Sequence, residues 1–209
     1  MRELVSGTPV RLVRMTWMTS PLGSPPRIVE SRALPPQPPI TGDGRLYRIG
    51  GGASVSSLDW QLDLIDVRGH HLTFDVPPGG ESHLLGLAGP QVSVEAAATH
   101  RLRRGSAYRT TSSRITLVRP KRTRQSASRV LCLTYLPGRV EAELSSAVLD
   151  GSPVLDDDIA AIVLADGELT AGGSRLRRYD AVLPEAGSAA SLMADRASVV
   201  LLSVRHVGR

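Results

Sequence analysis

Glu81 and His83 are the two side chains whose spacing best suits acid–base chemistry. They stand two residues apart, and alternate residues of a strand project from the same face. A carboxylate that orients an imidazole, or acts as a base where apolar surroundings raise its pKa, moves protons without a cofactor. Such a pair suits a metal-independent isomerase or cyclase. A solvated carboxylate after the turn at residues 77–80 is the alternative for Glu81, and both stay open.

Metal-binding patterns are incomplete in this chain. Iron, manganese or nickel held on strands needs imidazoles two residues apart, whereas His70 and His71 are adjacent and face opposite ways. One of them would join Glu81 and His83 only if their strands pair. The three aspartates at 156–158 fit a solvated turn, because adjacent carboxylates diverge along a strand. We therefore expect neither a metal nor another cofactor.

Cys132 is the only cysteine and lies between two leucines. A nucleophilic thiolate needs a nearby base and electropositive surroundings, so we predict a core or pocket residue instead. Gly50, Gly51 and Gly52 lack the lysine and following helix of a phosphate-binding loop. We interpret them as a flexible turn before the next strand.

The elements that must position these residues are strands. Residues 58–64 alternate strictly between apolar and polar, which predicts a half-buried strand with Trp60 pointing inward. Further short strands are predicted at residues 72–75, 83–87, 92–96, 114–119, 129–136, 140–144, 159–164, 181–183 and 198–207. The weak helix candidate is 186–197. Many short strands separated by Gly and Pro turns predict an all-β barrel or sandwich.

An internal repeat indicates that the fold is built twice. Residues 101–107 (RLRRGSA) return 74 residues later as residues 175–181 (RLRRYDA), each after a glycine turn and a short alternating segment. We predict a single domain over 1–209 with two related lobes, residues 1–150 and 151–209. The first contains a proline-rich loop at 20–44, which is either a lid, a crossing arm or a disordered insertion.

Composition sets limits on partners and compartment. No apolar run is long enough for a membrane span, and the N-terminus lacks a basic region followed by an apolar signal segment, so we expect a cytoplasmic protein. Only Lys121 of the 25 basic residues is lysine, and residues 101–129 contain ten basic side chains and no acidic one. This segment is either a phosphate-binding surface or the solvated face of strands. We do not expect nucleic acid as a partner, because only Tyr108 offers a stacking platform there.

Several segments together resemble the HutD/Ves family of bicupins. The resemblance spans most of the chain and rests on Trp17 and residues 58–62, 74–89, 137–142 and 176–181. It implies two cupin lobes, an association with histidine utilisation and the binding of a small metabolite, without an established catalytic activity. The chain departs from the family pattern at Pro77 and Ser82. Val130, Cys132 and Thr134 also stand where the family presents acidic and amide groups.

These departures imply a diverged bicupin that binds a greasier ligand. We expect a largely apolar, metal-free cavity for a small organic molecule, with Trp17, Trp60, Val130, Cys132 and Thr134 as ligand-binding residues and His83 beside them. The function is either ligand binding or sensing, or a diverged pathway role. The alternative is a cofactor-independent isomerase or cyclase of specialised metabolism that uses Glu81 and His83. Pairing of barrel faces into a homodimer stays open.

Overall fold

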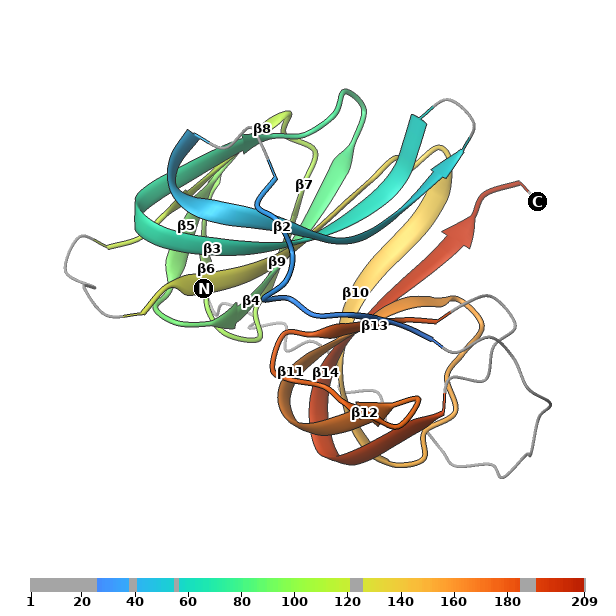
Figure 1. The fold of residues 1–209 in the computed structure, drawn as a ribbon. Helices are drawn as coiled ribbons and strands as arrows, with labels where there is room; N and C mark the ends of the chain where they lie inside the picture. Colours follow the sequence, from blue (N-terminus) through green and yellow to red (C-terminus); the bar gives the residue numbers. More distant parts are fainter. Residues whose placement is uncertain (1–25, 38–40, 55–56, 121–125, 185–190, 209) are drawn as a thin grey trace, which may run out of the picture.

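The computed structural model describes residues 26–37, 41–54, 57–120, 126–184 and 191–208. Every regular element in these ranges is a strand, and they form two sheets (Figure 1). The predicted all-β class with two related lobes is therefore confirmed. Trp17 lies outside the described residues.

The first sheet rolls into a nearly closed barrel. Its order is β6-β5-β8-β3-β9-β4-β7, with β2 added beside β3. The edge strands β6 and β7 contact each other without forming a ladder, so the barrel is nearly closed. Its strands are β2 (Thr41–Ser54), β3 (Ser57–Asp75), β4 (Glu81–Ala88), β5 (Val92–Glu95), β6 (Thr99–Leu102), β7 (Ala107–Thr110), β8 (Arg114–Val118) and β9 (Ser128–Tyr135).

The second sheet forms the other lobe. Its order is β1-β13-β11-β14-β10, with β12 added beside β11. Its strands are β1 (Arg27–Val29), β10 (Val140–Gly151), β11 (Ile159–Ala171), β12 (Ser174–Arg175), β13 (Ala181–Leu183) and β14 (Leu192–His206). Strand β10 runs through the predicted lobe junction at residues 150 and 151 and pairs with β14 along most of its length. The division of the lobes at these residues stays a prediction.

The repeated segment folds into the same turn in both lobes. In the first copy, Ser106 donates its N–H to Arg103 O over 3.0 Å, and Ser106 Oγ accepts the Arg103 N–H over 2.6 Å. In the second, Asp180 donates its N–H to Arg177 O over 2.9 Å, and Asp180 Oδ2 accepts the Arg177 N–H over 2.9 Å. A side chain that caps its own turn explains why Ser and Asp stand at this place.

The third residue of each turn also matches. Gly105 and Tyr179 have φ of 75° and 74°, in the left-handed region that favours glycine. Gly105 donates its N–H to Gly86 O over 2.8 Å, and Tyr179 donates its own to Leu164 O over 2.7 Å. The neighbours β3-β9-β4-β7 in the barrel therefore correspond to β10-β14-β11-β13 in the second lobe.

Three clusters of buried apolar side chains form the core. One, with Ile65 and Leu84, fills the barrel, and another, with Ile162, fills the second lobe. The third, with Leu62 and Leu144, lies where the outer faces of the two sheets pack together. Strands β3, β4, β9, β10, β11 and β14 are therefore covered on both faces over much of their length.

Two local predictions were wrong. Gly50, Gly51 and Gly52 lie within β2 rather than in a turn, because the indole of Trp60 on β3 packs against this backbone. A Cβ added to Gly52 would lie 2.3 Å from Trp60 Nε1. The described end of the weak helix candidate, from Leu192, is strand β14, which pairs with β10 and β11.

The described part of the proline-rich loop crosses between the lobes. Its strand β1 pairs with β13 of the second lobe, and Ser31 donates from its N–H and Oγ to Asp180 Oδ1 over 2.9 and 3.1 Å. Gln37 then donates its N–H to Leu46 O of β2 over 2.8 Å. The predicted loop extends to residue 44, whereas β2 already begins at Thr41.

Candidate functional site

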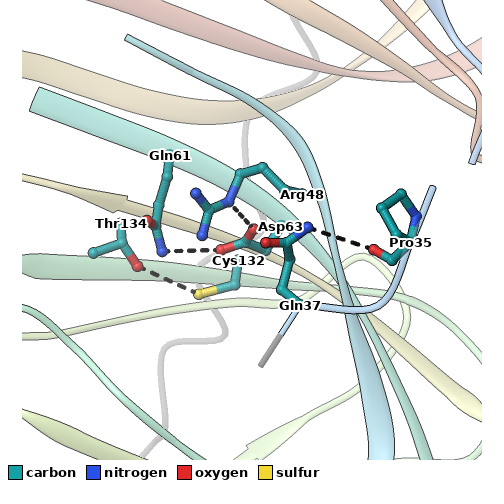
Figure 2. Close-up of polar contacts among 7 residues, drawn as sticks. All are labelled: Pro35, Gln37, Arg48, Gln61, Asp63, Cys132 and Thr134. Atoms are coloured by element: carbon teal, nitrogen blue, oxygen red, sulfur yellow. Dashed lines mark hydrogen bonds and ion pairs between the residues drawn. The ribbon is translucent and has the colours of Figure 1, made fainter. Parts of the chain in front are cut away.

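A polar cluster lies on the inner face of the barrel, across three adjacent strands. Arg48 of β2 is opposite Asp63 of β3, and Asp63 is opposite Cys132 of β9. The next row joins Gln61 to Thr134. Paired residues of antiparallel strands share a face, so the sheet register brings these five side chains together (Figure 2).

Asp63 is the central group of this cluster. Arg48 Nε donates to Asp63 Oδ1 over 2.5 Å, and Gln61 Nε2 donates to Asp63 Oδ2 over 3.0 Å. The Asp63 side chain is 2% exposed and that of Arg48 is 35% exposed. Burial raises the pKa of Asp63 to about 6, although the guanidinium and the amide both lower it. Asp63 is thus a buried carboxyl that titrates near neutral pH.

Hydroxyl and thiol groups continue the cluster into the barrel. Thr134 Oγ1 lies 3.2 Å from Ser82 Oγ and 3.8 Å from Cys132 Sγ. Burial, with the nearby Asp63 carboxylate, raises the pKa of Cys132 to about 12. The shift favours the thiol form, and Cys132 is packed in the apolar core of the barrel.

The residues predicted to line one cavity lie on two faces of the barrel wall. Val130, Cys132 and Thr134 are buried and point into the barrel. Trp60 belongs to the cluster between the lobes, and His83 also faces the second lobe. The structure therefore brings together the three β9 residues but not the tryptophan or the histidine with them.

Glu81 and His83 share one face of β4, as their spacing predicts. His83 is 3% exposed, and its Nδ1 accepts the backbone N–H of Leu144 over 3.3 Å. Burial, together with the charge of Arg109, lowers the pKa of His83 to about 4. Glu81 is half-buried and lies directly opposite Tyr135 on β9, and burial, together with the nearby Glu81 carboxylate, raises the pKa of that phenol to about 12. The imidazole is neutral and held by the second lobe.

Within the described residues, no group of three or more His, Cys, Asp or Glu side chains is placed to hold a metal ion. His70 Nδ1 instead lies 2.7 Å from the carbonyl oxygen of Arg119, the residue that follows β8. The described residues also contain no helix long and apolar enough to cross a membrane.

The described arginines of the basic segment are largely paired through tertiary contacts. Four of its arginines form ion pairs with acids from elsewhere in the chain: Arg104 with Asp166, Arg109 with Glu143, Arg114 with Asp75, and Arg129 with Asp66. Arg119 is buried and donates to the carbonyls of residues 67, 68 and 126. The run of positive charge along the sequence is therefore dispersed over several acidic partners.

Sequence reasoning missed Arg48, Gln61 and Asp63. The alternation through residues 58–64 predicts a half-buried strand with Trp60 pointing inward and with Gln61 and Asp63 on the opposite, polar face. In the structure this face is the barrel interior, and the apolar face meets the second lobe. The signal was present as two polar side chains two residues apart on one strand.

Comparisons of the sequence and of the structure with known proteins identify the fold through solved structures alone. No protein-family model matches the chain, and no curated protein matches it significantly. HutD from Pseudomonas fluorescens superposes with a TM-score of 0.68 at 16% identity, over 88% of this chain and 100% of that one. A conserved protein of unknown function from Pseudomonas aeruginosa superposes with a TM-score of 0.65 at 22% identity, over 87% of this chain and 99% of that one.

A cupin 2 conserved barrel domain protein from Leptotrichia buccalis gives a TM-score of 0.51 at 10% identity, over 86% of this chain and 96% of that one. Together with the duplicated strand order, these likenesses establish a HutD-like cupin fold for the chain.

Proposed function

We propose that this cupin binds a small organic molecule at the polar end of its first barrel, where Asp63, Arg48 and Gln61 meet. The observation that carries the proposal is the buried Asp63 carboxyl with a pKa of about 6. Ion pairing to Arg48 only partly offsets the cost of burying this charge, so the group weakens the fold at neutral pH. Perturbed titratable groups of this kind cluster at functional sites.

The surroundings of the cluster support the class of ligand. Val130 and Cys132 are buried in the apolar core beside it, and Thr134 adds one hydroxyl. Among the described residues, no acceptor binds the terminal Nη atoms of Arg48, whose side chain is partly exposed. A largely apolar molecule with one polar or anionic group complements this arrangement.

A second candidate function is proton transfer without a cofactor, as in an isomerase or cyclase. Asp63 favours it, because a base works best when its pKa lies near the operating pH. The geometry favours His83 less for this role, since its Nδ1 is taken by the Leu144 amide of the second lobe. Under this candidate the base is Asp63 rather than the Glu81 and His83 pair.

Ligand screening against matched variants tests the proposal. We expect a hit from a thermal-shift screen of small organic acids and alcohols to bind at least tenfold more weakly to Asp63→Asn and Arg48→Gln, measured by calorimetry. Asp75→Asn is the control, because Asp75 lies on the same strand with its side chain 67% exposed and paired to Arg114. Equal affinity for all variants would reject this site.

The same samples separate binding from catalysis. Incubation of a bound ligand with the wild-type protein, followed by mass spectrometry or NMR, leaves the ligand unchanged if the protein is a binding module. Conversion that is lost in Asp63→Asn and kept in Asp75→Asn would instead support the enzyme.

A further inference from the structure

A pocket of about 210 Å³ lies between the two lobes, away from the Arg48 and Asp63 cluster. Its walls are mostly apolar and include Leu85 and Leu87 of β4 and Val200 of β14. Exposed residues form its rim, with Val148 of β10 52% exposed and Arg104 paired to Asp166 over 3.1 Å. It therefore opens to solvent beside an ion pair that bridges the lobes.

The internal duplication relates this pocket to a second place between the lobes. The turn at residues 104–105 corresponds to residues 178–179, as the matched hydrogen bonds show. Residues 85–87 correspond to 163–165, since the same register shift follows Gly86 on β4 and Leu164 on β11. By the same pairing, residues 198–200 of β14 correspond to 129–131 of β9.

At the site formed by residues 129–131, 163–165 and 178–179, which corresponds to the pocket, the side chain of Tyr179 occupies the equivalent space. Tyr179 is 5% exposed and belongs to the apolar cluster between the lobes. The guanidinium of Arg129 lies 4.3 Å from its ring centroid and that of Arg178 lies 5.0 Å away. The phenol ring thus lies between apolar walls with cations over it, a favourable arrangement for an aromatic ring.

Gly105 is the counterpart of Tyr179 and carries no side chain. Its φ of 75° matches the 74° of Tyr179, and a Cβ added to Gly105 would meet nothing within 4 Å. Arg104 is the counterpart of Arg178. The pocket is therefore the Tyr179 site with its ring missing and with one of its arginines retained.

We propose that this pocket binds a small single-ring aromatic molecule, whose ring takes the place that the Tyr179 ring takes in the other half. An apolar cavity of roughly 150 Å³ holds benzene, so this pocket has room for one substituted ring. Arg104 faces the ring as Arg178 faces Tyr179. The hydroxyls of Ser146 and Ser198 in the pocket wall offer hydrogen bonds to a ring substituent such as a phenol oxygen.

The test uses p-cresol, the side chain of tyrosine as a free molecule. We expect it to shift the amide NMR signals of Val148 and Val199 in the ¹⁵N-labelled wild-type protein. Gly105→Tyr should abolish these shifts, because the new ring fills the pocket. Gly173→Tyr is the matched control, with φ of 81° and nothing within 4 Å of an added Cβ, and it should bind like the wild type.

Two further measurements keep the outcome clear. Val148→Asp places a charge in the exposed wall of the pocket and should weaken the binding of p-cresol at least tenfold. This variant tests the proposal even if Gly105→Tyr fails to fold. The saturated analogue 4-methylcyclohexanol should bind at least fivefold more weakly than p-cresol, because it lacks a π-face.

Three results would each overturn the proposal: no p-cresol shifts at pocket amides, unchanged affinity in Gly105→Tyr or Val148→Asp, or equal affinity for the saturated analogue. The inference is independent of the barrel site. Asp63→Asn should leave p-cresol binding unchanged, and Gly105→Tyr should leave binding of a barrel ligand unchanged, so either proposal can fail alone.

Discussion

The backbone N–H of Leu144 donates to Nδ1 of His83 over 3.3 Å, which ties β10 of the second lobe to β4 of the barrel. Both residues are buried in the interface between the lobes, His83 at 3% exposed and Leu144 also at 3%. A buried amide that loses its acceptor costs free energy, so this bond has consequences for stability.

Replacement of His83 by alanine should therefore lower the free energy of unfolding by about 1–3 kcal/mol. Chemical denaturation followed by circular dichroism measures the change. Glu81→Gln, on the same face but half-buried, is the control and should change stability by less than about 0.5 kcal/mol. Equal effects of the two substitutions would contradict the role given to the Leu144 bond.

Asp63 and His83 should make opposite contributions to the pH dependence of stability. The folded-state pKa of Asp63 is raised from 3.8 to about 6, so its contribution to the free energy of unfolding falls as pH rises through this interval. The folded-state pKa of His83 is lowered from 6.5 to about 4, so its contribution is complete above pH 6.5 and is lost as pH falls toward 4. Each effect is about 3 kcal/mol at most.

Unfolding titrations between pH 4 and 6.5 separate the two groups. Relative to wild type, Asp63→Asn should become more stable as pH rises, and His83→Gln should become less stable. Parallel curves for wild type and both variants would show that neither group has the shifted pKa.

Cys132 should react slowly with thiol reagents. Burial and the Asp63 carboxylate raise its pKa to about 12, and the side chain is 1% exposed. We expect modification by a disulfide reagent at pH 8 to follow global unfolding, with fast reaction only in denaturant. Fast modification of the native protein would mean that the interior of the barrel is open to the reagent.

Gly89 and Gly167 should be equally sensitive to substitution. Both have φ of 82°, and an added Cβ would lie 2.3 Å from Ala127 O at Gly89 and 2.7 Å from Arg196 O at Gly167. Alanine at either position should cost at least about 1 kcal/mol of unfolding free energy, through strain and close contact with backbone.

Gly138→Ala is the matched control, since it has neither a positive φ nor an atom within 4 Å of an added Cβ. A large loss at only one of the two equivalent glycines would argue against the equivalence of the lobes.

The sequence by itself determined the all-β class, many of the strands and the duplication, although it did not indicate β2. Alternation with a period of two marks a strand wherever it occurs, and the repeated RLRRGSA and RLRRYDA segments share the Ser or Asp that caps the turn. These signals are local, so they survive without knowledge of what packs around them. The resemblance to the HutD/Ves family, which shares only residues 176–181 with the repeat, agrees with the fold found.

Only the tertiary structure decided which faces carry the site. A period of two shows that a strand has two faces but not what covers either of them, and β3 is covered on both, by the barrel interior and by the second lobe. Asp63 and Arg48 meet only because the register of β2 against β3 sets them opposite each other. His83 is likewise assigned to the lobe interface by Leu144, 61 residues further along the chain, a contact that no local pattern contains.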